Sequence, residues 1–190
     1  MLISRSIHKS LFLIALALLS ALTFGQSKTS FGSTNATQCF MASANPSSLL
    51  DAKICTNAIR HDKLSKRDLA ATHTNRGIIL AAVGKLHQAL EDHNQAAQLK
   101  GDLPKIYINR GNVFHRLEEY EKALLDYQKA LDLGGVPVDI VQYNRGLSLQ
   151  KIGKNREALN ALEKALRHNP GSLRVKAKIK AISSPRNIQK

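Results

Sequence analysis

The sequence predicts an all-α protein built from stacked pairs of helices, and an internal repeat carries this prediction. The triplet Asn-Arg-Gly occurs three times, at 75–77, 109–111 and 144–146, so successive copies lie 34 and 35 residues apart. The dipeptide Ala-Leu begins twelve residues after each glycine, and a further alanine follows seven residues after that. A period of this length with matched small residues is typical of repeat proteins whose unit is a helical hairpin.

The first 25 residues have the pattern of a signal peptide. Two basic residues precede an apolar run over 11–24, and this run of 14 residues is shorter than the roughly 20 that a membrane-spanning helix needs. Small residues at Thr23 and Gly25 suit cleavage before Gln26. We therefore expect residues 1–25 to be removed and the mature chain to be periplasmic or secreted, with an uncleaved N-terminal anchor as the alternative.

The next segment is predicted to be a linker followed by a degenerate helical repeat. Residues 26–36 are rich in Ser, Thr and Gly, which is typical of a flexible linker. Within 37–69 we expect a short helix over 37–44 and a second helix over 46–59. These two helices would form a weak copy of the hairpin that repeats further along the chain.

Cys39 and Cys55 are the only cysteines in the sequence. In an exported protein an even number of cysteines predicts a disulfide, and only one intramolecular pairing is possible here. Closing a loop of this length stabilises by about 3 kcal/mol in the chain-entropy model. A redox or metal-binding pair is the alternative, but the sequence has neither a CxxC motif nor a nearby histidine at ligand spacing.

The three clear repeats are predicted over 70–103, 104–138 and 139–172, with one extra residue in the second. Each is expected to be a pair of helices, and the breaks at Gly84 and Gly153 separate the members of the first and third pairs. The glycine of each triplet has a packing role, because closely crossing helices need small side chains at their contact. A bulky side chain there would push the partner helix away.

The C-terminal segment 173–190 is predicted to be a basic capping helix and tail. No acidic residue follows Glu163, whereas the whole chain carries a net charge of +14. The alternating pattern over 173–182 also fits a strand, but the end of a stack of helices needs a capping helix with a polar outer face. We interpret the basic stripe as a charged cap; contact with an anionic membrane or envelope polymer is the alternative, and the segment lacks the aromatics that stack on nucleic-acid bases.

These repeats resemble the tetratricopeptide repeat. The large residue that this family has three positions after the glycine is present as Leu80, Phe114 and Leu149. The family's aromatic, four residues after the first alanine, is Tyr127 in the middle unit but His93 and Leu162 in the others, and its late proline is present only as Pro170. The resemblance implies a right-handed α-solenoid whose first helices line a concave groove that binds peptides or proteins.

The resemblance also implies which residues face that groove. The asparagines of the triplets, Asn75, Asn109 and Asn144, would form a ladder, and each amide can both donate to and accept from an extended peptide backbone. Further groove residues are expected at Asn112, His115, Arg116, Tyr143, Lys105 and Lys151. The basic side chains favour an acidic or carboxylate-bearing ligand. Solvated side chains without a ligand are the alternative.

The arginines of the triplets suggest ion pairs between the two helices of a repeat. Arg76 is followed sixteen residues later by Asp92, and Arg110 by Asp126 in the same way. The third copy differs, because Ala161 stands at the acid's position. We expect Arg76–Asp92 and Arg110–Asp126 to pair and to have a structural role, with solvated side chains as the alternative.

Motifs of catalysis do not stand out in this sequence. There is no HExxH pattern, no Gly-rich phosphate loop before Lys-Ser or Lys-Thr, and no Gly-x-Ser-x-Gly elbow. We therefore expect a non-catalytic scaffold or adaptor without cofactor or metal, which binds a protein or an extended peptide and no nucleic acid. An envelope-associated adaptor that uses the basic C-terminal segment is the alternative.

Overall fold

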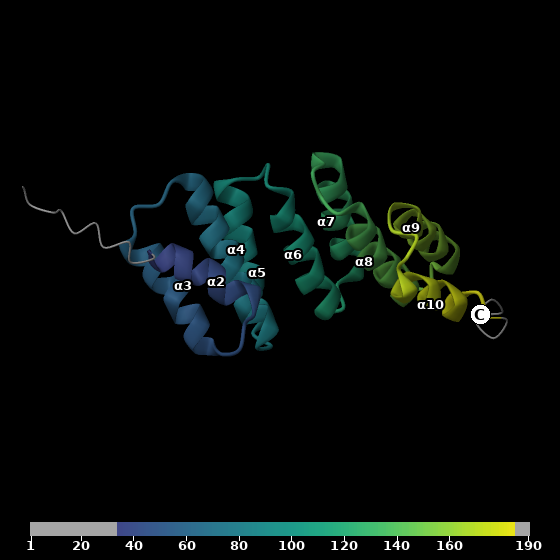
Figure 1. The fold of residues 1–190 in the computed structure, drawn as a ribbon, viewed down its shortest axis with the longest axis horizontal. Coiled ribbons are helices and arrows are strands. Elements are labelled where there is room, and N and C mark those ends of the chain that lie inside the picture. The colour runs from purple at the N-terminus through teal and green to yellow at the C-terminus, as the bar shows by residue number, and fades with distance from the viewer. Residues whose placement is uncertain (1–33, 185–190) are drawn as a thin grey trace, which may run out of the picture. The chain divides into compact units, whose positions relative to one another are not determined.

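The computed structural model describes residues 34–184, so the predicted signal peptide, most of the predicted linker and the last six residues lie outside the described part. Within it the chain forms nine α-helices and no strand (Figure 1). The helices are α2 (Asn35–Ala44), α3 (Leu49–His61), α4 (Lys66–Ala82), α5 (Leu86–Leu99), α6 (Pro104–Arg116), α7 (Tyr120–Leu133), α8 (Val138–Lys151), α9 (Asn155–His168) and α10 (Leu173–Ile182).

The helices pack as consecutive pairs. The four pairs are α2 with α3, α4 with α5, α6 with α7, and α8 with α9, and α10 packs against α9. The first helix of each later pair also contacts the second helix of the preceding pair, so α4 meets α3, α6 meets α5 and α8 meets α7. This arrangement confirms the predicted all-α repeat solenoid. None of the helices between residues 34 and 184 combines the length and the apolar character needed to cross a bilayer.

Helix starts differ from the sequence prediction where polar side chains cap them. α3 begins at Leu49, not at 46, because Asp51 accepts hydrogen bonds from the backbone N–H groups of Ser47 and Ser48. α2 begins at Asn35, inside the segment predicted to be a linker, and the backbone N–H of Ala36 donates to Asp62 at 2.9 Å. The prediction of a helix over 173–182 is confirmed.

The glycines of the triplets lie where the two helices of a repeat cross most closely. A Cβ atom added at Gly77 or Gly111 would lie 2.7 Å from the ring of His93 or Tyr127, respectively, and one at Gly146 would lie 2.9 Å from Cγ of Leu162. Real Cβ contacts are not this short, so a larger residue would separate the helices. The structure therefore confirms the packing role that the repeat pattern predicts.

A residue with positive φ ends the first helix of each repeat. Gly84 and Gly153 have φ angles of 82° and 76°, in the left-handed region that glycine adopts without a steric penalty. At the same position the middle repeat has Glu118, with φ of 63°. The turn between α6 and α7 is therefore the one of the three that holds a side chain in a strained conformation.

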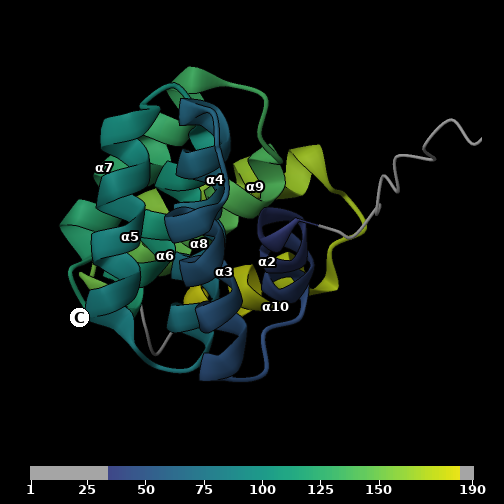
Figure 2. The same cartoon turned by 90° about the vertical axis from the view of Figure 1, so that its left-hand side faces the viewer.

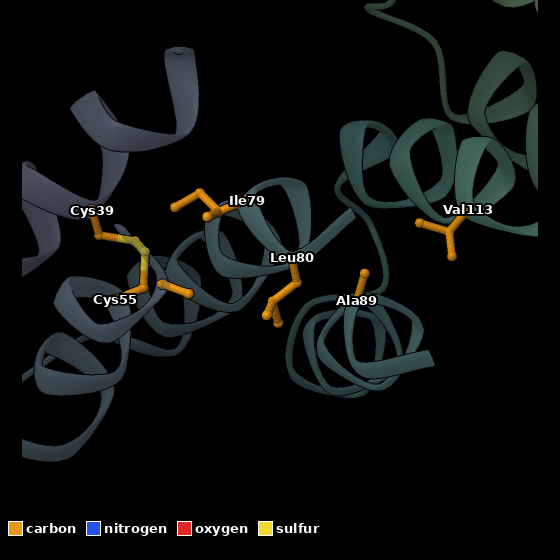
Figure 3. Packing of buried hydrophobic residues seen from close by; sticks show 7 residues of the cluster. Cys39, Cys55, Ile79, Leu80, Ala89 and Val113 are labelled. Carbon is orange, nitrogen blue, oxygen red and sulfur yellow. A yellow bond between two sulfur atoms is a disulfide. The ribbon is translucent and has the colours of Figure 1, made fainter. Parts of the chain in front are cut away.

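The N-terminal helix pair is joined by a disulfide and packs against the first repeat. Cys39 of α2 and Cys55 of α3 are bonded, with Cα atoms 4.7 Å apart. Both are fully buried in a cluster that includes Ile79 and Leu80 of α4 (Figure 3). α2 also contacts α4, and Figure 2 shows it beside α3. The pairing predicted from the cysteine count is present in the structure.

Candidate functional site

Two small hollows lie between consecutive first helices, and we call the surface that holds them the first-helix face. The hollow between α4 and α6 has a volume of about 250 Å³ and is lined by Ile78, Ala81, Ala82, His93, Asn109, Asn112, Val113 and Arg116. The hollow between α6 and α8 has a volume of about 270 Å³ and is lined by Asn112, His115, Arg116, Tyr127, Asn144 and Leu147. Asn112 and Arg116 border both, so α6 supplies the centre of the face.

Asn112 organises this centre through its side-chain oxygen. Oδ1 accepts hydrogen bonds from the Tyr127 hydroxyl and from Nδ2 of Asn144, each at 2.9 Å. The two bonds come from α7 and from the next repeat, so they fix the position of the amide relative to three helices. Asn144 is consequently half-buried and already engaged within the protein, and the three asparagines of the predicted ladder are not equivalent.

His115 and Arg116 are held by hydrogen bonds to other repeats. Nδ1 of His115 lies 2.8 Å from the Ser148 hydroxyl, and its ring packs edge-on against Tyr120. Burial, with a smaller contribution from the charge of Lys151, lowers the pKa of His115 below its ordinary value. Its ring is therefore uncharged at neutral pH. Arg116 donates from α6 to the carbonyl of Ala81 at the end of α4.

His93 borders the hollow between α4 and α6 and is almost completely buried. Its side chain stands where Tyr127 stands in the next repeat, but the counterpart of Asn112 is Ile78, which has no acceptor. Both ring nitrogens of His93 consequently lack a hydrogen-bond partner. Burial lowers the pKa of this imidazole to about 4, so the ring is neutral near pH 7.

The structure brings some of the predicted groove residues together and leaves others apart. Asn109, Asn112, Asn144, His115 and Arg116 line the two hollows. The residues that line neither hollow are Asn75, Lys105, Tyr143 and Lys151. The Tyr143 ring instead packs beneath the guanidinium of Arg174 on α10, 4.1 Å from its centre, so an intramolecular contact occupies it.

Leu147 and Ser148 are among the residues at the site that sequence reasoning missed. Leu147 lies at the same repeat position as Ile78 and Asn112, so comparing the three copies column by column would have found it. Ser148 replaces the buried Val113 of the preceding repeat, and its bond to His115 connects positions 33 residues apart. No local sequence pattern indicates the hydrogen bond between Ser148 and His115.

The predicted ion pairs are present, on a different surface of the repeats. Asp92 accepts from Nη2 and Nε of Arg76 at 2.7 and 2.8 Å, and Asp126 accepts from Arg110 at the same two distances. Each arginine also reaches the second helix of the preceding pair, since Nη1 donates to Thr56 or to Asn94 at 3.0 Å. We call this surface, between successive second helices, the second-helix face.

Asp92 has a second partner, because Nδ1 of His73 lies 2.9 Å from its Oδ1. Burial by itself would raise the pKa of the Asp92 carboxyl, but the hydrogen bonds from Arg76 and His73 outweigh it and the pKa is lowered. The same interaction raises the pKa of Arg76. Asp92 and Arg76 are therefore both charged at neutral pH.

A larger cleft, with a volume of about 560 Å³, lies on the second-helix face. It is lined by Leu49, Ala52, Lys53, Thr56, His73, Arg76, Leu80, Gln88, Glu91, Asp92 and Gln95. Its position between α3 and α5 differs from the groove that the family resemblance implies. Within residues 34–184, no three His, Cys, Asp or Glu side chains are grouped so that they could hold a metal ion.

Comparison with family models and solved structures identifies the repeats. Models of the tetratricopeptide repeat match residues 104–133 and 140–172. No curated protein matches the sequence. The Arabidopsis OM64 TPR domain superposes with a TM-score of 0.60 at 19% identity, covering 64% of this chain and 99% of that domain.

Two further structures combine a similar fold with a peptide-binding description. The second TPR domain of human RPAP3, solved with the HSP70 peptide SGPTIEEVD, has a TM-score of 0.59 at 23% identity and covers 63% of this chain and 99% of that domain. YrrB, described as a TPR protein with an unusual peptide-binding site, has a TM-score of 0.59 at 27% identity, covering 67% of this chain and 63% of that one. The matched models and the paired-helix architecture together show that residues 104–133 and 140–172 are tetratricopeptide repeats within an all-α repeat solenoid.

Proposed function

We propose that this protein is a non-catalytic scaffold that binds an extended peptide of a partner protein on the first-helix face, over α6 and α8. The observation that carries the proposal is the Asn112 amide, held in place by Tyr127 and Asn144 between two adjoining hollows. Polar groups that are already fixed lose little conformational freedom on binding, which favours affinity.

The charges around the face favour an acidic peptide. Arg116 borders both hollows, and Lys105 and Lys151 are exposed on the same two helices. Guanidinium and ammonium groups pair with carboxylates. The peptide SGPTIEEVD in the RPAP3 complex, which has three acidic side chains, is therefore a reasonable first probe.

A hydrolytic function is disfavoured by burial. His115 and Ser148 are in hydrogen-bond contact, as a base and a nucleophile would be. The Ser148 side chain, however, is completely buried, and its hydroxyl also donates to the carbonyl oxygen of Asn144 at 3.3 Å. A substrate cannot reach that oxygen without separating α6 from α8.

We also propose that the protein is exported and that its mature chain starts near Gln26. The apolar run at the N-terminus and the bonded cysteine pair support this location, because stable disulfides are typical of exported proteins. N-terminal sequencing of protein recovered from the envelope or the medium would test it. A retained Met1 would contradict cleavage and support an anchor.

The binding proposal is tested by fluorescence anisotropy with labelled SGPTIEEVD and with its neutral analogue, in which Glu and Asp become Gln and Asn. We expect the acidic peptide to bind more tightly, and the double substitution of Asn109 and Asn144 by Ala to weaken it about tenfold or more, which corresponds to about 1.4 kcal/mol. Asn75→Ala should have a smaller effect, because Asn75 lines neither hollow.

The matched control replaces the exposed Gln98, Gln128 and Asn160 on the second helices with Ala. This triple variant should bind like the native protein. If the labelled peptide does not bind, affinity capture from an envelope extract takes the place of the anisotropy measurement. The capture is done once with the native protein and once with the double variant. A partner that both proteins recover equally would overturn the assignment of the first-helix face.

A further inference from the structure

On the second-helix face, we call the arginine of each Asn-Arg-Gly triplet and the residue sixteen positions later an arginine slot. The slot occurs three times, and the third copy lacks the acid. Arg110 pairs with Asp126, as Arg76 pairs with Asp92. The corresponding arginine in the next repeat is Arg145 on α8, but the residue that corresponds to the acid is Ala161 on α9. Within the described part of the chain, no carboxylate lies at ion-pair distance from Arg145.

Two buried polar atoms in this third slot lack a hydrogen-bond partner. One is Nε of Arg145 and the other is Oε1 of Gln142, a residue that is only 7% exposed. Gln142 occupies the repeat position of His73. In the first repeat, His73 and the arginine are the two side chains that contact the Asp92 carboxylate from α4. The unpaired atoms therefore belong to the two residues that correspond to the partners of the acid.

A carboxylate is the group that would satisfy both residues. Asp92 provides the template, since it accepts from the guanidinium at 2.7 and 2.8 Å and lies 2.9 Å from the neighbouring ring nitrogen. A carboxylate above Ala161 would accept from Nε of Arg145. The amide of Gln142, turned about its last bond, would donate from Nε2, because the two orientations of an amide are interchangeable in shape.

We propose that the third slot is a receptor for a carboxylate, which an Asp or Glu side chain of a partner protein supplies when it docks on the second-helix face between α7 and α9. Arg145 is part-buried, as are the paired arginines of the first two slots, whose side chains are 23% and 20% exposed. α10 packs on α9 and carries four basic residues and no acid, which favours an acidic partner. This face is distinct from the first-helix face.

The first test observes the arginine side chains directly by NMR. Sodium acetate is titrated into the native protein at constant ionic strength, with sodium chloride as the reference, and the Nε–Hε signals are followed. We expect the signal of Arg145 to shift saturably with acetate and not with chloride. Those of Arg76 and Arg110, already paired, should stay in place. A signal of Arg145 that does not respond to acetate would overturn the proposal.

The second test restores the missing acid. In Ala161→Asp, the Arg145 signal should move to the region of the two paired arginines and its affinity for acetate should fall about tenfold or more. Ala161→Asn is the matched control, because it fills the same space without a charge. If Ala161→Asp leaves both the signal and the acetate affinity unchanged, the slot does not hold a carboxylate in the way that Asp92 is held.

The third test separates a protein side chain from a free small anion. Poly-L-glutamate replaces acetate as the probe and should shift the Arg145 signal at a lower carboxylate concentration, because a polymer presents many side chains at once. A response to acetate alone would indicate a small-anion site and overturn the docking proposal. The double variant of Asn109 and Asn144 should respond like the native protein, so failure of peptide binding on the first-helix face does not affect this result.

Discussion

At the residue scale, His93 shows how one side chain can set the pH response of a helix pair. The first repeat places an imidazole where the second places Tyr127, in the same close contact with a glycine of the first helix. The phenol finds an acceptor in Asn112, whereas the imidazole finds none. Its pKa falls from 6.5 to about 4 because protonation would bury a charge.

This shift makes the stability of the α4–α5 pair depend on pH. As pH falls from 6.5 to 4, an unfolded chain takes up a proton on His93 while the folded chain does not. Stability is therefore complete above pH 6.5 and is lost progressively down to pH 4, by about 3 kcal/mol in total. Hydrogen exchange of the α4 and α5 amides at several pH values measures this loss.

The variant His93→Phe should remove that dependence between pH 4 and 6.5 and should leave the pair at least as stable at pH 7. A phenyl ring fits, because the larger ring of Tyr127 packs on Gly111 in the same way. The control is His87→Gln on the exposed side of α5, which should keep the native pH profile. An unchanged profile in His93→Phe would contradict the assignment.

At the element scale, the turn between α6 and α7 differs from its two counterparts. Glu118 adopts the left-handed conformation in which the other repeats have Gly84 and Gly153. The left-handed conformation costs an L residue such as glutamate about 1–2 kcal/mol. Replacement by glycine removes this cost, but glycine loses more backbone entropy on folding, which offsets part of the gain. We expect Glu118→Gly to raise the free energy of unfolding by up to about 1 kcal/mol, measured by urea unfolding followed by circular dichroism.

Glu121→Gly is the matched control for that variant. Glu121 is exposed in the first turn of α7, where glycine has a low helix propensity and where an acid interacts favourably with the helix dipole. This second variant should therefore be less stable than the native protein. If both substitutions lower stability equally, the turn at Glu118 is not strained.

Structural features that recur in several repeats could be predicted from the sequence, whereas features that occur only once were harder to predict. The crossing glycines and the Arg76–Asp92 and Arg110–Asp126 pairs could be inferred because each occurs in at least two copies at fixed spacing. The start of α3 could not, because a single carboxylate at Asp51 determines it. The hydrogen bond between Asn112 and Asn144 also escaped prediction, since the repeat pattern treats each asparagine separately.

At the scale of the whole molecule, the core between residues 34 and 184 is divided among several clusters instead of forming one. The cysteine pair belongs to a cluster shared by α2, α3, α4 and α5 and reaching Val113 of α6, and Leu162, Val175 and Ile182 belong to another at the C-terminal end. In such a protein, stability is approximately a sum of repeat and interface contributions. A substitution is therefore expected to lower the stability of its own repeat and the adjoining one more than that of the rest of the chain.

Replacing both cysteines with Ser should accordingly destabilise the N-terminal pair more than the rest. The chain-entropy model gives about 3 kcal/mol for a loop of this length, and two buried hydroxyls without partners would add to the cost. Hydrogen exchange should increase for α2 and α3 and remain close to native for α8 and α9. Equal increases along the whole chain would indicate that the repeats unfold as one unit.

The divided core affects how the molecule responds to mechanical tension. When the chain is pulled from its two ends, α10 is held by non-covalent packing on α9 and by the contact of Arg174 with Tyr143 of α8, whereas α2 is covalently tied to α3 and also contacts α4. Helices at the C-terminal end would detach first, one hairpin after another. The crosslinked end would remain folded longest, so the protein would lengthen in steps from one side only.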